Sequence, residues 1–448
     1  MRIDMFVYNR CTTDARVLKE AGTLSEAGHD LRVVAVADGS APLREDRAGF
    51  TIVRIVRNPI HYRLLKALRR LTGAARRGAK RTARAVEQGE RIHRTRTQRL
   101  LLAPVALARW LGRPAWRAIS GAVIEFEGLT RRALLLPHKP LMFLDYYWRG
   151  YRLIRKDPPQ ALHAHDLNTL PLAAALAWRF RLRLVYDAHE LYPEISTLSP
   201  REARIWKAIE KLLARRADTV ITVCGSIADE IASRNGIRRP TVLLNCPAAK
   251  PPPPASRSLL HERVGLPEDE RIVLYQGGFA PHRGLEAVLR CAGSLQGAKI
   301  VLMGWGRTED SLRDMAQREG LDGKVIFTEP VPREEVISYA AGATVGLIPY
   351  EPVGLNNTYT TPNKLFDYMA AGLPIAASRL PELVRFVDGG GIGRTFSPGD
   401  HEALAALLNG LLADEEQLAA MGERARAAAD RYTWQQESAK LLSVYAAR

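Results

Sequence analysis

Residues 2–37, RIDMFVYNRCTTDARVLKEAGTLSEAGHDLRVVAVA, carry the pattern that decides the fold of this chain. The apolar run Arg2–Tyr8 predicts a buried strand, and the polar residues 9–14 predict the loop that follows it. Apolar residues then recur at the spacing of a helix, at Ala15, Leu18, Ala21, Leu24 and Ala27. Gly28 ends that helix, and Leu31–Ala37 predicts a second strand. A strand, a loop, a helix and a strand in this order open a parallel α/β sheet.

This alternation of strands and helices continues to about residue 246, with one interruption by a basic segment. Thr51–Val56 predicts a further strand before the interruption. The alternation resumes near Ala161, with strands predicted at Leu182–Tyr186, Thr219–Val223 and Thr241–Leu244 and a helix at Glu202–Ala214. Proline continues neither a helix nor a central strand, so Pro251–Pro254 is expected to be a stiff linker.

A second alternation follows the prolines, with strands predicted at Arg271–Tyr275, Lys299–Met303, Val325–Phe327, Thr344–Ile348 and Pro374–Ala377. We therefore predict two Rossmann-like α/β domains, residues 1–246 and 247–430, that face each other across a ligand cleft. The helix predicted at Thr433–Ala447, within residues 431–448, is expected to cross back to the first domain. Folds of this class bind ligands outside the carboxyl ends of their strands.

The composition is that of a globular protein with two or three domains, since 448 residues are 46% hydrophobic and 25% charged. Four cysteines lie far apart without a CxxC pair, which argues against a disulfide framework and fits a reducing compartment. The opening MRIDMFVYNR lacks the apolar core of a signal peptide. No apolar run reaches the roughly 18–20 residues of a spanning helix. We therefore expect a cytoplasmic protein, soluble or peripheral to a membrane.

One basic segment accounts for almost all of the net charge of +17. Residues 57–139 contain 20 Lys and Arg against 4 Asp and Glu, and so hold 16 of the net positive charges. Part of it, Leu100–Trp116, predicts an amphipathic helix with two tryptophans, which suits an anionic membrane surface. We expect a basic helical insertion at about 57–140 that rests on the inner face of the cell membrane. The alternative is a solvated insertion. Nucleic acid is not expected as a partner, because the segment has no recognition motif.

Titratable residues gather at the ends of two predicted strands, in HAHD (163–166) and DAHE (187–190). Alternate residues of a strand share a face, so the two histidines of HAHD are expected to point the same way. Such clusters are typical of a cleft, and we expect the catalytic residues to be His163, His165, Asp187, His189 and Glu190. The alternatives are structural histidines and helix capping by Asp187. A metal site is not expected, because no third ligand follows at a helical or strand-like spacing.

Two glycine-rich strand ends predict a phosphate site in the second domain. In residues 276–284, Gly277 and Gly278 allow a close approach of backbone to phosphate, and the N-terminus of the next helix favours anions. Arg283 adds a forked donor suited to a pyrophosphate. MGWG (303–306), with Gly304, is the second such end. The alternative is an ordinary surface turn, since neither segment has the spacing of a dinucleotide fingerprint or a P-loop.

The strongest local pattern is TPNKLFDYMAAGLP at residues 361–374. Pro362 predicts the start of a helix whose first turn, with Asn363, offers free amides. Lys364 stands where it neutralises a phosphate, and Asp367 one turn later accepts hydrogen bonds from ribose hydroxyls. The alternative for Asp367 is a solvated position on the helix. Gly372 is expected to end this helix.

In this order the motifs resemble those of the retaining family-4 glycosyltransferases with the GT-B fold. The resemblance covers nearly the whole chain apart from the basic insertion, and rests on Asn9 with DAR (14–16), HAHD (163–166), DAHELYPE (187–194), GG…RG (277–284), MGWG (303–306) and PNKLFDYMAAG (362–372). It implies a nucleotide-diphosphate sugar as co-substrate in the C-terminal domain, an acceptor in the N-terminal domain, and transfer with retention. It also implies no metal or other cofactor, and the sequence has no Asp-x-Asp motif.

The resemblance also implies roles for single residues. His165 is similar to the cleft histidine near the donor sugar, with His163 and His189 on the same wall. The donor side implied by the resemblance consists of Gly277, Gly278, Arg283 on the diphosphate, Gly304, Pro362, Asn363, Lys364 on the phosphate loop and Asp367 on the ribose. The acceptor side consists of Asn9, Asp14 and Arg16.

The sequence departs from the family pattern at two positions. Tyr359 stands where the family has the first of two glutamates eight positions apart, and Glu351 is the acid that we expect to compensate. Phe279 follows the paired glycines, where a basic residue is common. These departures resemble the subgroup that acts in bacterial surface-polysaccharide assembly. We therefore expect transfer of a sugar from a nucleotide sugar to a lipid-linked or polysaccharide acceptor. The alternatives are a nucleotide-sugar epimerase of the same fold and a catalytically weak membrane-associated scaffold.

Overall fold

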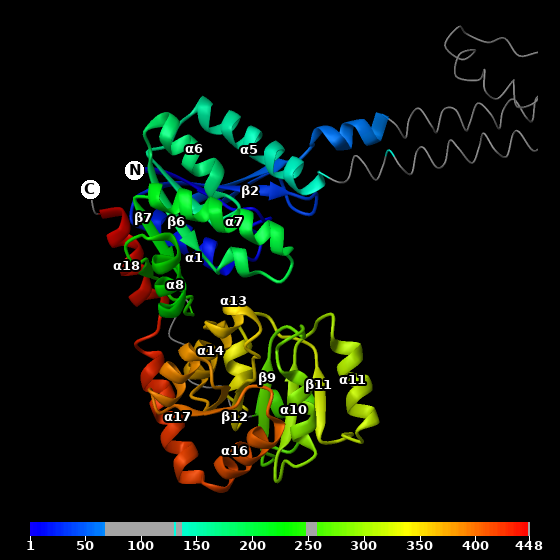
Figure 1. Ribbon diagram of the computed structural model, residues 1–448. Coiled ribbons are helices and arrows are strands. Elements are labelled where there is room, and N and C mark those ends of the chain that lie inside the picture. Colours follow the sequence, from blue (N-terminus) through cyan, green and yellow to red (C-terminus); the bar gives the residue numbers. More distant parts are fainter. Residues whose placement is uncertain (68–129, 131–136, 248–257, 447–448) are drawn as a thin grey trace, which may run out of the picture. The chain divides into compact units, whose positions relative to one another are not determined.

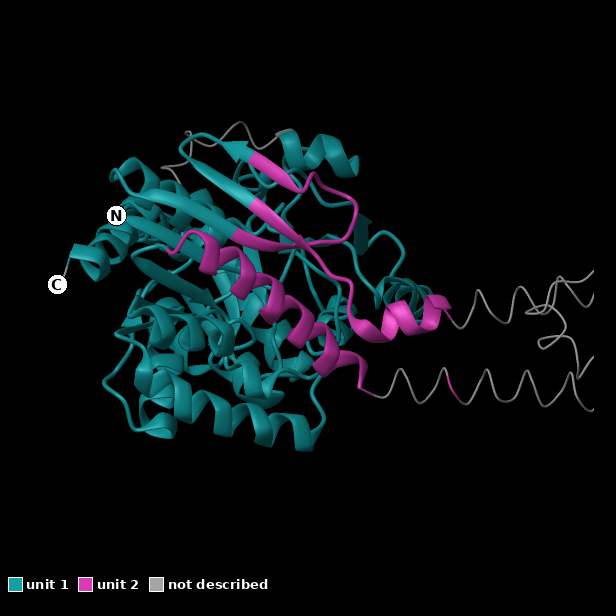
Figure 2. Ribbon diagram, turned by 90° about the horizontal axis from the view of Figure 1, so that it is seen from above, with its two compact units in different colours: residues 1–33, 46–52, 159–448 teal, residues 34–45, 53–158 magenta. Residues whose placement is uncertain are grey.

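The computed structural model describes residues 1–67, 130, 137–247 and 258–446 (Figure 1). The chain divides into two compact units, one of residues 1–33, 46–52 and 159–448 and the other of residues 34–45 and 53–158 (Figure 2). Most of the basic insertion predicted at about 57–140 lies outside the described residues. None of the helices in the described part of the chain combines the length and the apolar character needed to cross a bilayer.

The first sheet has eight strands in the order β3-β4-β2-β1-β5-β6-β7-β8. Its strands are β1 (Arg2–Phe6), β2 (Asp30–Ala37), β3 (Arg44–Arg47), β4 (Phe50–Val56), β5 (Ala161–His165), β6 (Arg183–Ala188), β7 (Thr219–Thr222) and β8 (Thr241–Val242). Strands β1, β5, β6, β7 and β8 run parallel. The strand order reverses between β1 and β5, and in such sheets ligands bind beyond the carboxyl ends of the strands at this point.

The helices that follow these strands begin where the local sequence provides a cap. They are α1 (Ala15–Glu26), α5 (His138–Lys156), α6 (Leu170–Phe180), α7 (Pro200–Leu213) and α8 (Gly225–Asn235). Asp14 caps α1 by accepting the N–H of Val17 at 3.3 Å. Helix α7 begins two residues earlier than predicted, because Ser199 and Glu202 form a capping box before and within its first turn.

The second sheet has six parallel strands in the order β11-β10-β9-β12-β13-β14. Its strands are β9 (Ile272–Gln276), β10 (Lys299–Met303), β11 (Val325–Thr328), β12 (Val345–Ile348), β13 (Ile375–Ser378) and β14 (Gly393–Phe396). Numbered along the chain, this is the Rossmann order 3-2-1-4-5-6. The predicted fold class, two parallel α/β domains of the Rossmann kind, is therefore confirmed.

Helices cover both faces of the second sheet, because its strands are apolar on both sides. Val273 and Tyr275 of β9 belong to one buried cluster, and Ile272 and Leu274 of the same strand belong to another. The helices are α9 (Ser258–Val264), α10 (Leu285–Ala292), α11 (Glu309–Arg318), α12 (Val336–Ala340), α13 (Gly354–Thr358), α14 (Asn363–Ala371), α15 (Pro381–Leu383), α16 (His401–Ala413) and α17 (Glu415–Ala429).

The C-terminal helix α18 (Trp434–Ala446) packs against α1 at the other end of the sequence. The indole Nε1 of Trp434 donates a hydrogen bond to the Thr23 hydroxyl at 2.8 Å. Near the end of α18, the Tyr445 hydroxyl lies 2.8 Å from His163 Nδ1 on β5. The last residues of the chain therefore complete the surroundings of a strand that also carries predicted site residues.

Strand β3, strand β14 and helix α5 are among the elements that were not predicted from the sequence. Strand β3 consists of charged, partly exposed residues that lack apolar alternation. Strand β14 is only four residues long, Gly393–Phe396. Helix α5 begins at the end of the stretch that was assigned to the insertion and continues beyond it. Its buried residues include Tyr146 and Ile154. Short strands and basic helices give weak patterns in a sequence, so these elements appear only in the structure.

Candidate functional site

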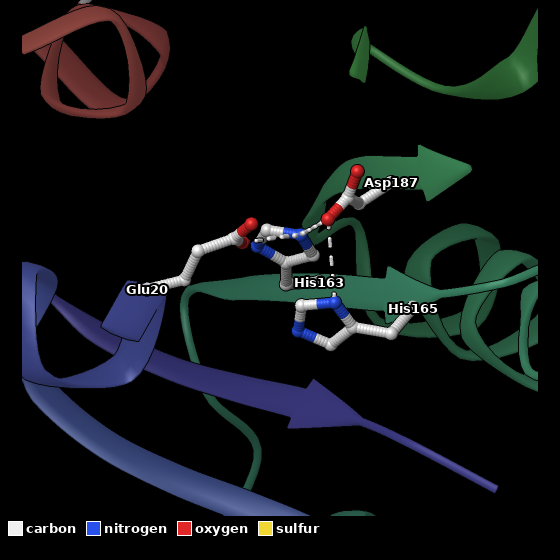
Figure 3. Close-up of side chains that lie close together, drawn as sticks. All are labelled: Glu20, His163, His165 and Asp187. Atoms are coloured by element: carbon white, nitrogen blue, oxygen red, sulfur yellow. Dashed lines mark ion pairs between the residues drawn. The ribbon is translucent and has the colours of Figure 1, made fainter. Parts of the chain in front are cut away.

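The two histidines of HAHD lie on β5 and share one face of the first sheet, as predicted. The rings of His163 and His165 stack with centroids 4.3 Å apart and planes at 15°. The strand register places His165 opposite Asp187 of the neighbouring strand β6, so their side chains converge. Figure 3 shows these three side chains together with Glu20 of α1. Neither histidine is exposed to solvent.

A buried ion pair joins the acceptor-side residue Arg16 to Asp187. The Arg16 guanidinium donates to both carboxylate oxygens of Asp187, at 2.8 and 2.7 Å, and to the Leu243 carbonyl at 2.7 Å. Burial opposes the ionisation of Asp187, but Arg16 and then His189 outweigh it and hold the pKa of this carboxyl well below its usual range. Asp187 caps no helix, so that alternative is wrong.

His189 connects this ion pair to the solvent-accessible side. Its Nε2 lies 3.2 Å from Asp187 Oδ2 and 3.0 Å from His165 Nδ1, and its side chain is 18% exposed. Burial lowers the pKa of His189, but the carboxylates of Asp166 and Asp187 raise it more strongly, to about 9. His189 is therefore a cation at neutral pH, next to an ionised aspartate.

Burial favours the uncharged forms of Glu20 and His163, the other members of the cluster. Burial, reinforced by the repulsion of Asp187, raises the pKa of Glu20 well above its ordinary value. Burial, reinforced by the neighbouring His165, lowers the pKa of His163 well below its ordinary value. The cluster therefore contains one ionised acid, Asp187, between the cations Arg16 and His189.

In the folded chain, two further residues of metal-binding type lie beside the two histidines, contrary to the expectation from sequence spacing. Within the part of the chain that is described, Glu20, His163, His165 and Asp187 offer ligand atoms that all lie within 4.8 Å of one another. These residues come from three elements, so their spacing along the chain does not reveal them. Arg16 already fills the place of a cation here, because it binds Asp187 and lies 3.0 Å from Glu20.

A cavity of about 460 Å³ lies beside this cluster, within the unit of residues 1–33, 46–52 and 159–448. It has the size of a small-molecule site. Of the predicted site residues, it is lined by Asp14, Arg16, His189, Glu190, Arg283 and Asn363. A larger cavity of about 570 Å³, at Arg215 and Arg238, contains none of the predicted residues. The smaller cavity is therefore the candidate functional site.

A pair of hydrogen bonds holds the DAHELYPE loop at the cavity. The Asn356 side chain of α13 accepts from the Leu191 N–H at 2.8 Å and donates to the Leu191 carbonyl at 3.0 Å. The neighbouring Glu190 is exposed, yet partial desolvation and the carboxylate of Asp166 raise its pKa to about 7. Its carboxyl therefore exchanges a proton near neutral pH, at the edge of the cavity.

Lys364 presents a buried ammonium group without a hydrogen-bond partner. The side chain is 6% exposed, and Nζ lies 3.5 Å from the centroid of the Tyr275 ring and 5.1 Å from that of Tyr350. Burial, and secondly the nearby Arg283, lower the pKa of Lys364 well below its ordinary value. A buried cation without a counter-ion costs free energy, so this position favours the arrival of an anion.

The predicted glycines bring two backbone segments into contact beside Lys364. A Cβ on Gly304 would lie 1.9 Å from the Gly277 carbonyl oxygen, so only glycine allows this approach. Gly277 itself has φ +127°, and a Cβ there would lie 3.4 Å from Lys364 Nζ. Gly278 accepts a hydrogen bond from the Tyr275 hydroxyl at 2.9 Å. The two glycine-rich strand ends are thus one structural feature next to the free ammonium.

Asp367 is buried and paired, so the alternative of a solvated helix position is wrong. Arg333 donates to its two carboxylate oxygens at 2.6 and 2.7 Å, and the Gln276 side chain donates to Oδ2 at 3.0 Å. Asp367 is 1% exposed, whereas the Arg333 side chain is 51% exposed. Sequence reasoning missed Arg333 because it stands in the loop after β11, which carries no glycine or strand-end pattern.

The other predicted residues divide into those near the cavity and those behind it. Asn9 donates to Asp14 at 2.8 Å and accepts from the Cys11 N–H at 2.7 Å, which shapes the loop after β1. His165 lies behind His189, and its Nε2 has no hydrogen-bond partner among the described residues. Pro362 precedes α14, and Asn363 accepts from the Asn245 side chain at 3.1 Å. The side chain of Glu351 lies 3.1 Å from His282 rather than in the cavity lining.

Two family models match separate parts of the chain. Residues 256–428 match that of the glycosyl transferases group 1, and residues 105–247 match that of the glycosyl transferase 4-like domain. A glycogen synthase of Mycobacterium tuberculosis is 29% identical over 303 residues, 64% of this chain and 69% of the relative. A D-inositol 3-phosphate glycosyltransferase of Corynebacterium urealyticum is 24% identical over 360 residues, 73% of this chain and 80% of the relative.

Solved structures of the same fold cover the whole chain. A sucrose-phosphate synthase of Thermosynechococcus elongatus superposes with a TM-score of 0.67 at 17% identity, over 99% of this chain and 98% of that structure. Anabaena HepE in complex with UDP and glucose superposes with a TM-score of 0.66 at 15% identity, over 100% of both chains. At these identities the likeness concerns the fold alone.

Proposed function

Because the chain is a glycosyltransferase composed of two Rossmann-like domains, we propose that it transfers a sugar, with retention, to a lipid-linked or polysaccharide acceptor in cell-surface glycan synthesis. The donor is a nucleotide-diphosphate sugar, and the leaving diphosphate is stabilised by protein groups without a metal ion. Anabaena HepE, which was solved in complex with UDP and glucose and with UDP-glucose, supports a donor of this class.

The observation that carries the proposal is the buried, unpartnered ammonium of Lys364. It lies beside the glycine-rich strand ends and near Arg283, which lines the cavity. A diphosphate that binds there gives Lys364 Nζ a direct hydrogen-bonded counter-ion, which none of the described residues provides. Arg283 and the amides in the first turn of α14 add further donors to the phosphate oxygens.

The chemistry breaks the bond between the anomeric carbon and the donor phosphate oxygen and forms a bond to the acceptor oxygen on the same face. Negative charge develops on the departing diphosphate, next to Lys364 and Arg283, where fixed positive charges stabilise it in a site of low dielectric. The departing phosphate oxygen takes the proton of the acceptor hydroxyl, so the reaction needs no strong protein base. Bound donor and acceptor exclude water from the cavity, which limits hydrolysis of the donor.

The acceptor side is the wall formed by Asp14, Arg16, His189 and Glu190. The carboxylates of Asp166 and Asp187 keep His189 in its charged form, so His189 donates hydrogen bonds to sugar hydroxyls. His165 supports His189 from behind and keeps Nε2 available for the donor sugar. Glu190, with a pKa of about 7, accepts from an acceptor hydroxyl when it is ionised.

Asp367 is proposed to bind the ribose of the donor nucleotide. In the present structure Arg333 occupies both of its oxygens, so a ribose diol competes with this ion pair. Arg333 is half-exposed, and the ribose hydroxyls replace its hydrogen bonds to the buried carboxylate of Asp367 when it leaves. An arginine that moves from Asp367 on donor binding is then free to contact the nucleotide.

We place the enzyme at the cytoplasmic face of the cell membrane, where lipid-linked acceptors are found. The basic insertion at about 57–140 supports this location, since it holds 16 of the 17 net positive charges of the chain. Each basic residue near an anionic lipid surface adds about 1 kcal/mol of attraction.

A thermal-shift screen tests the proposal on the full-length chain in the presence of EDTA. Sugar nucleotides of UDP, GDP, ADP, dTDP and CMP are compared on the parent, on Lys364→Met and on the control Lys324→Met. A donor at 100 times its Kd stabilises the parent by about 2.7 kcal/mol. We expect one donor class to stabilise the parent and the control but not Lys364→Met. Loss of the donor shift in EDTA, or no shift with any compound, would overturn the proposal. Conversion of the donor without an acceptor would indicate an epimerase.

A further inference from the structure

A stripe of basic and apolar side chains runs along the exposed face of α7, outside the site and outside the predicted insertion. Glu210 is the buried residue on this helix of 14 residues. Beyond Pro200, the exposed residues of the helix and of the turn that follows it are Arg201, Arg204, Ile205, Lys207, Ala208, Lys211, Leu212, Arg215 and Arg216. All of them belong to one compact unit. We refer to these nine residues as the α7 stripe.

Apolar residues form the centre of the α7 stripe. Ile205, Ala208 and Leu212 are spaced at i, i+3 and i+7 and so lie on one line of the helix surface. Ile205 is 52% exposed and Leu212 is 57% exposed. These two large aliphatic side chains thus leave about half of their surface exposed to solvent, on a helix with a well-formed N-cap.

The charge of the α7 stripe has one sign. Its other six members are Lys and Arg, and the two acidic residues of α7 point elsewhere. Glu202 is bound in the capping box with Ser199, and Glu210 is buried and accepts from the Tyr186 hydroxyl at 3.0 Å. A helix with an apolar line flanked by basic residues has the composition of an interfacial helix on anionic lipid.

Other partners fit the α7 stripe less well. A soluble polyanion such as a nucleic acid binds through charge and has no use for a central aliphatic line. Protein interfaces are depleted in lysine, whereas this stripe holds Lys207 and Lys211 in addition to four arginines. We propose that α7 docks on the surface of an anionic phospholipid membrane, with Ile205, Ala208 and Leu212 entering the boundary between headgroups and acyl chains.

Docking through α7 has a consequence for the site. The Trp206 ring, on the opposite face of α7, packs edge-on against the Tyr192 ring, with the two ring centroids 5.2 Å apart. The Lys207 ammonium pairs with the Glu194 carboxylate at 2.8 Å. Tyr192 and Glu194 belong to the loop that also carries His189 and Glu190, which line the cavity. A membrane bound by α7 therefore holds the acceptor side of the proposed transferase close to the lipid surface. This consequence rests on the proposed function, whereas the docking itself does not.

Vesicle binding of the full-length chain tests the docking. Flotation is measured with vesicles of phosphatidylcholine containing one-third phosphatidylglycerol, and with phosphatidylcholine alone. The apolar variant is Ile205→Ser with Leu212→Ser, and the basic variant is Arg201→Ser with Lys211→Ser. Each basic residue contributes about five-fold to partitioning, so we expect the basic variant to bind the anionic vesicles about twenty-fold more weakly. We expect a loss of at least five-fold for the apolar variant.

Matched variants at other exposed positions provide the controls. Leu43 is 54% exposed, and Arg318 is an exposed helical arginine outside the stripe, so Leu43→Ser and Arg318→Ser are expected to bind within two-fold of the parent. Unchanged melting and donor-induced shifts show that the variants are folded and that the donor site is independent of docking. Parental binding by both stripe variants overturns the proposal. A loss confined to the basic variant also overturns it, since it indicates charge attraction without lipid insertion.

Discussion

Replacing Lys364 by methionine separates the cost of its buried charge from its benefit to donor binding. The parent carries an ammonium that has no hydrogen-bond partner and is 6% exposed. An unsatisfied buried polar group costs about 1–3 kcal/mol, and the contact with the Tyr275 ring returns part of it. We therefore expect Lys364→Met to raise the free energy of unfolding by about 1–2 kcal/mol, and the melting temperature by roughly 2–6 °C.

The same variant is expected to lose activity. Removal of one charged donor from an anion-stabilising site costs about 10²–10³ in turnover, and the donor-induced thermal shift is expected to disappear. Chemical denaturation and donor turnover are measured on the parent, on Lys364→Met and on Lys324→Met. Lys324 is exposed and bonds the Gly293 carbonyl, so its replacement is expected to change stability by less than about 0.5 kcal/mol.

The dependence on pH gives an independent check of the reasoning. Burial lowers the pKa of Lys364, so the unfolded chain binds more protons at this residue than the folded chain does. Stability linked to Lys364 therefore rises with pH between its folded pKa and its ordinary value, and the advantage of Lys364→Met shrinks over that range. A variant that is less stable than the parent and still gains a normal donor shift would refute the assignment of Lys364 as a poised phosphate ligand.

Three further substitutions test other parts of the site. Arg16→Met removes the two hydrogen bonds of Arg16 to the buried carboxylate of Asp187, so urea unfolding should show a loss of about 3–5 kcal/mol, whereas Arg239→Met, in an exposed pair, should cost less than about 1 kcal/mol. His189 has a folded pKa of about 9 and an ordinary value of 6.5, so its stabilisation is complete below pH 6.5 and lost as pH rises to about 9. The free energy of unfolding of the parent should thus exceed that of His189→Gln by up to about 3 kcal/mol at pH 6 but not at pH 10. Equal differences at the two pH values would contradict a charged His189. Gly304→Ala places a Cβ 1.9 Å from a carbonyl oxygen, so it should lower the free energy of unfolding by about 1–3 kcal/mol. It should also abolish the donor-induced thermal shift. Gly22→Ala, with open space and a helical position, should gain about 0.5–1 kcal/mol, and a neutral Gly304→Ala would disprove the tight approach of the two glycine-rich strand ends.

Much of the fold follows from local patterns in the sequence. Apolar runs and helical spacing place β1, α1 and β2 within one or two residues of their positions, because these elements form from contacts between near neighbours. Turn chemistry is equally local, so Gly372 ends α14 in the left-handed conformation, with φ 68°, as predicted. The same holds for the pairing of His163 with His165 on one face, since alternation is a property of any strand.

The charge states and partners of the site follow only from the tertiary structure. Arg16 and Asp187 are 171 residues apart, and Arg333 and Asp367 are 34 apart. Their pairing depends on the order of the strands in each sheet, which no periodicity records. Glu20 has the spacing of an ordinary helix residue, yet packing places it among two histidines and an aspartate and keeps it neutral. Sequence patterns determine which residue types lie at strand ends, and long-range packing decides which of them meet and which carry charge.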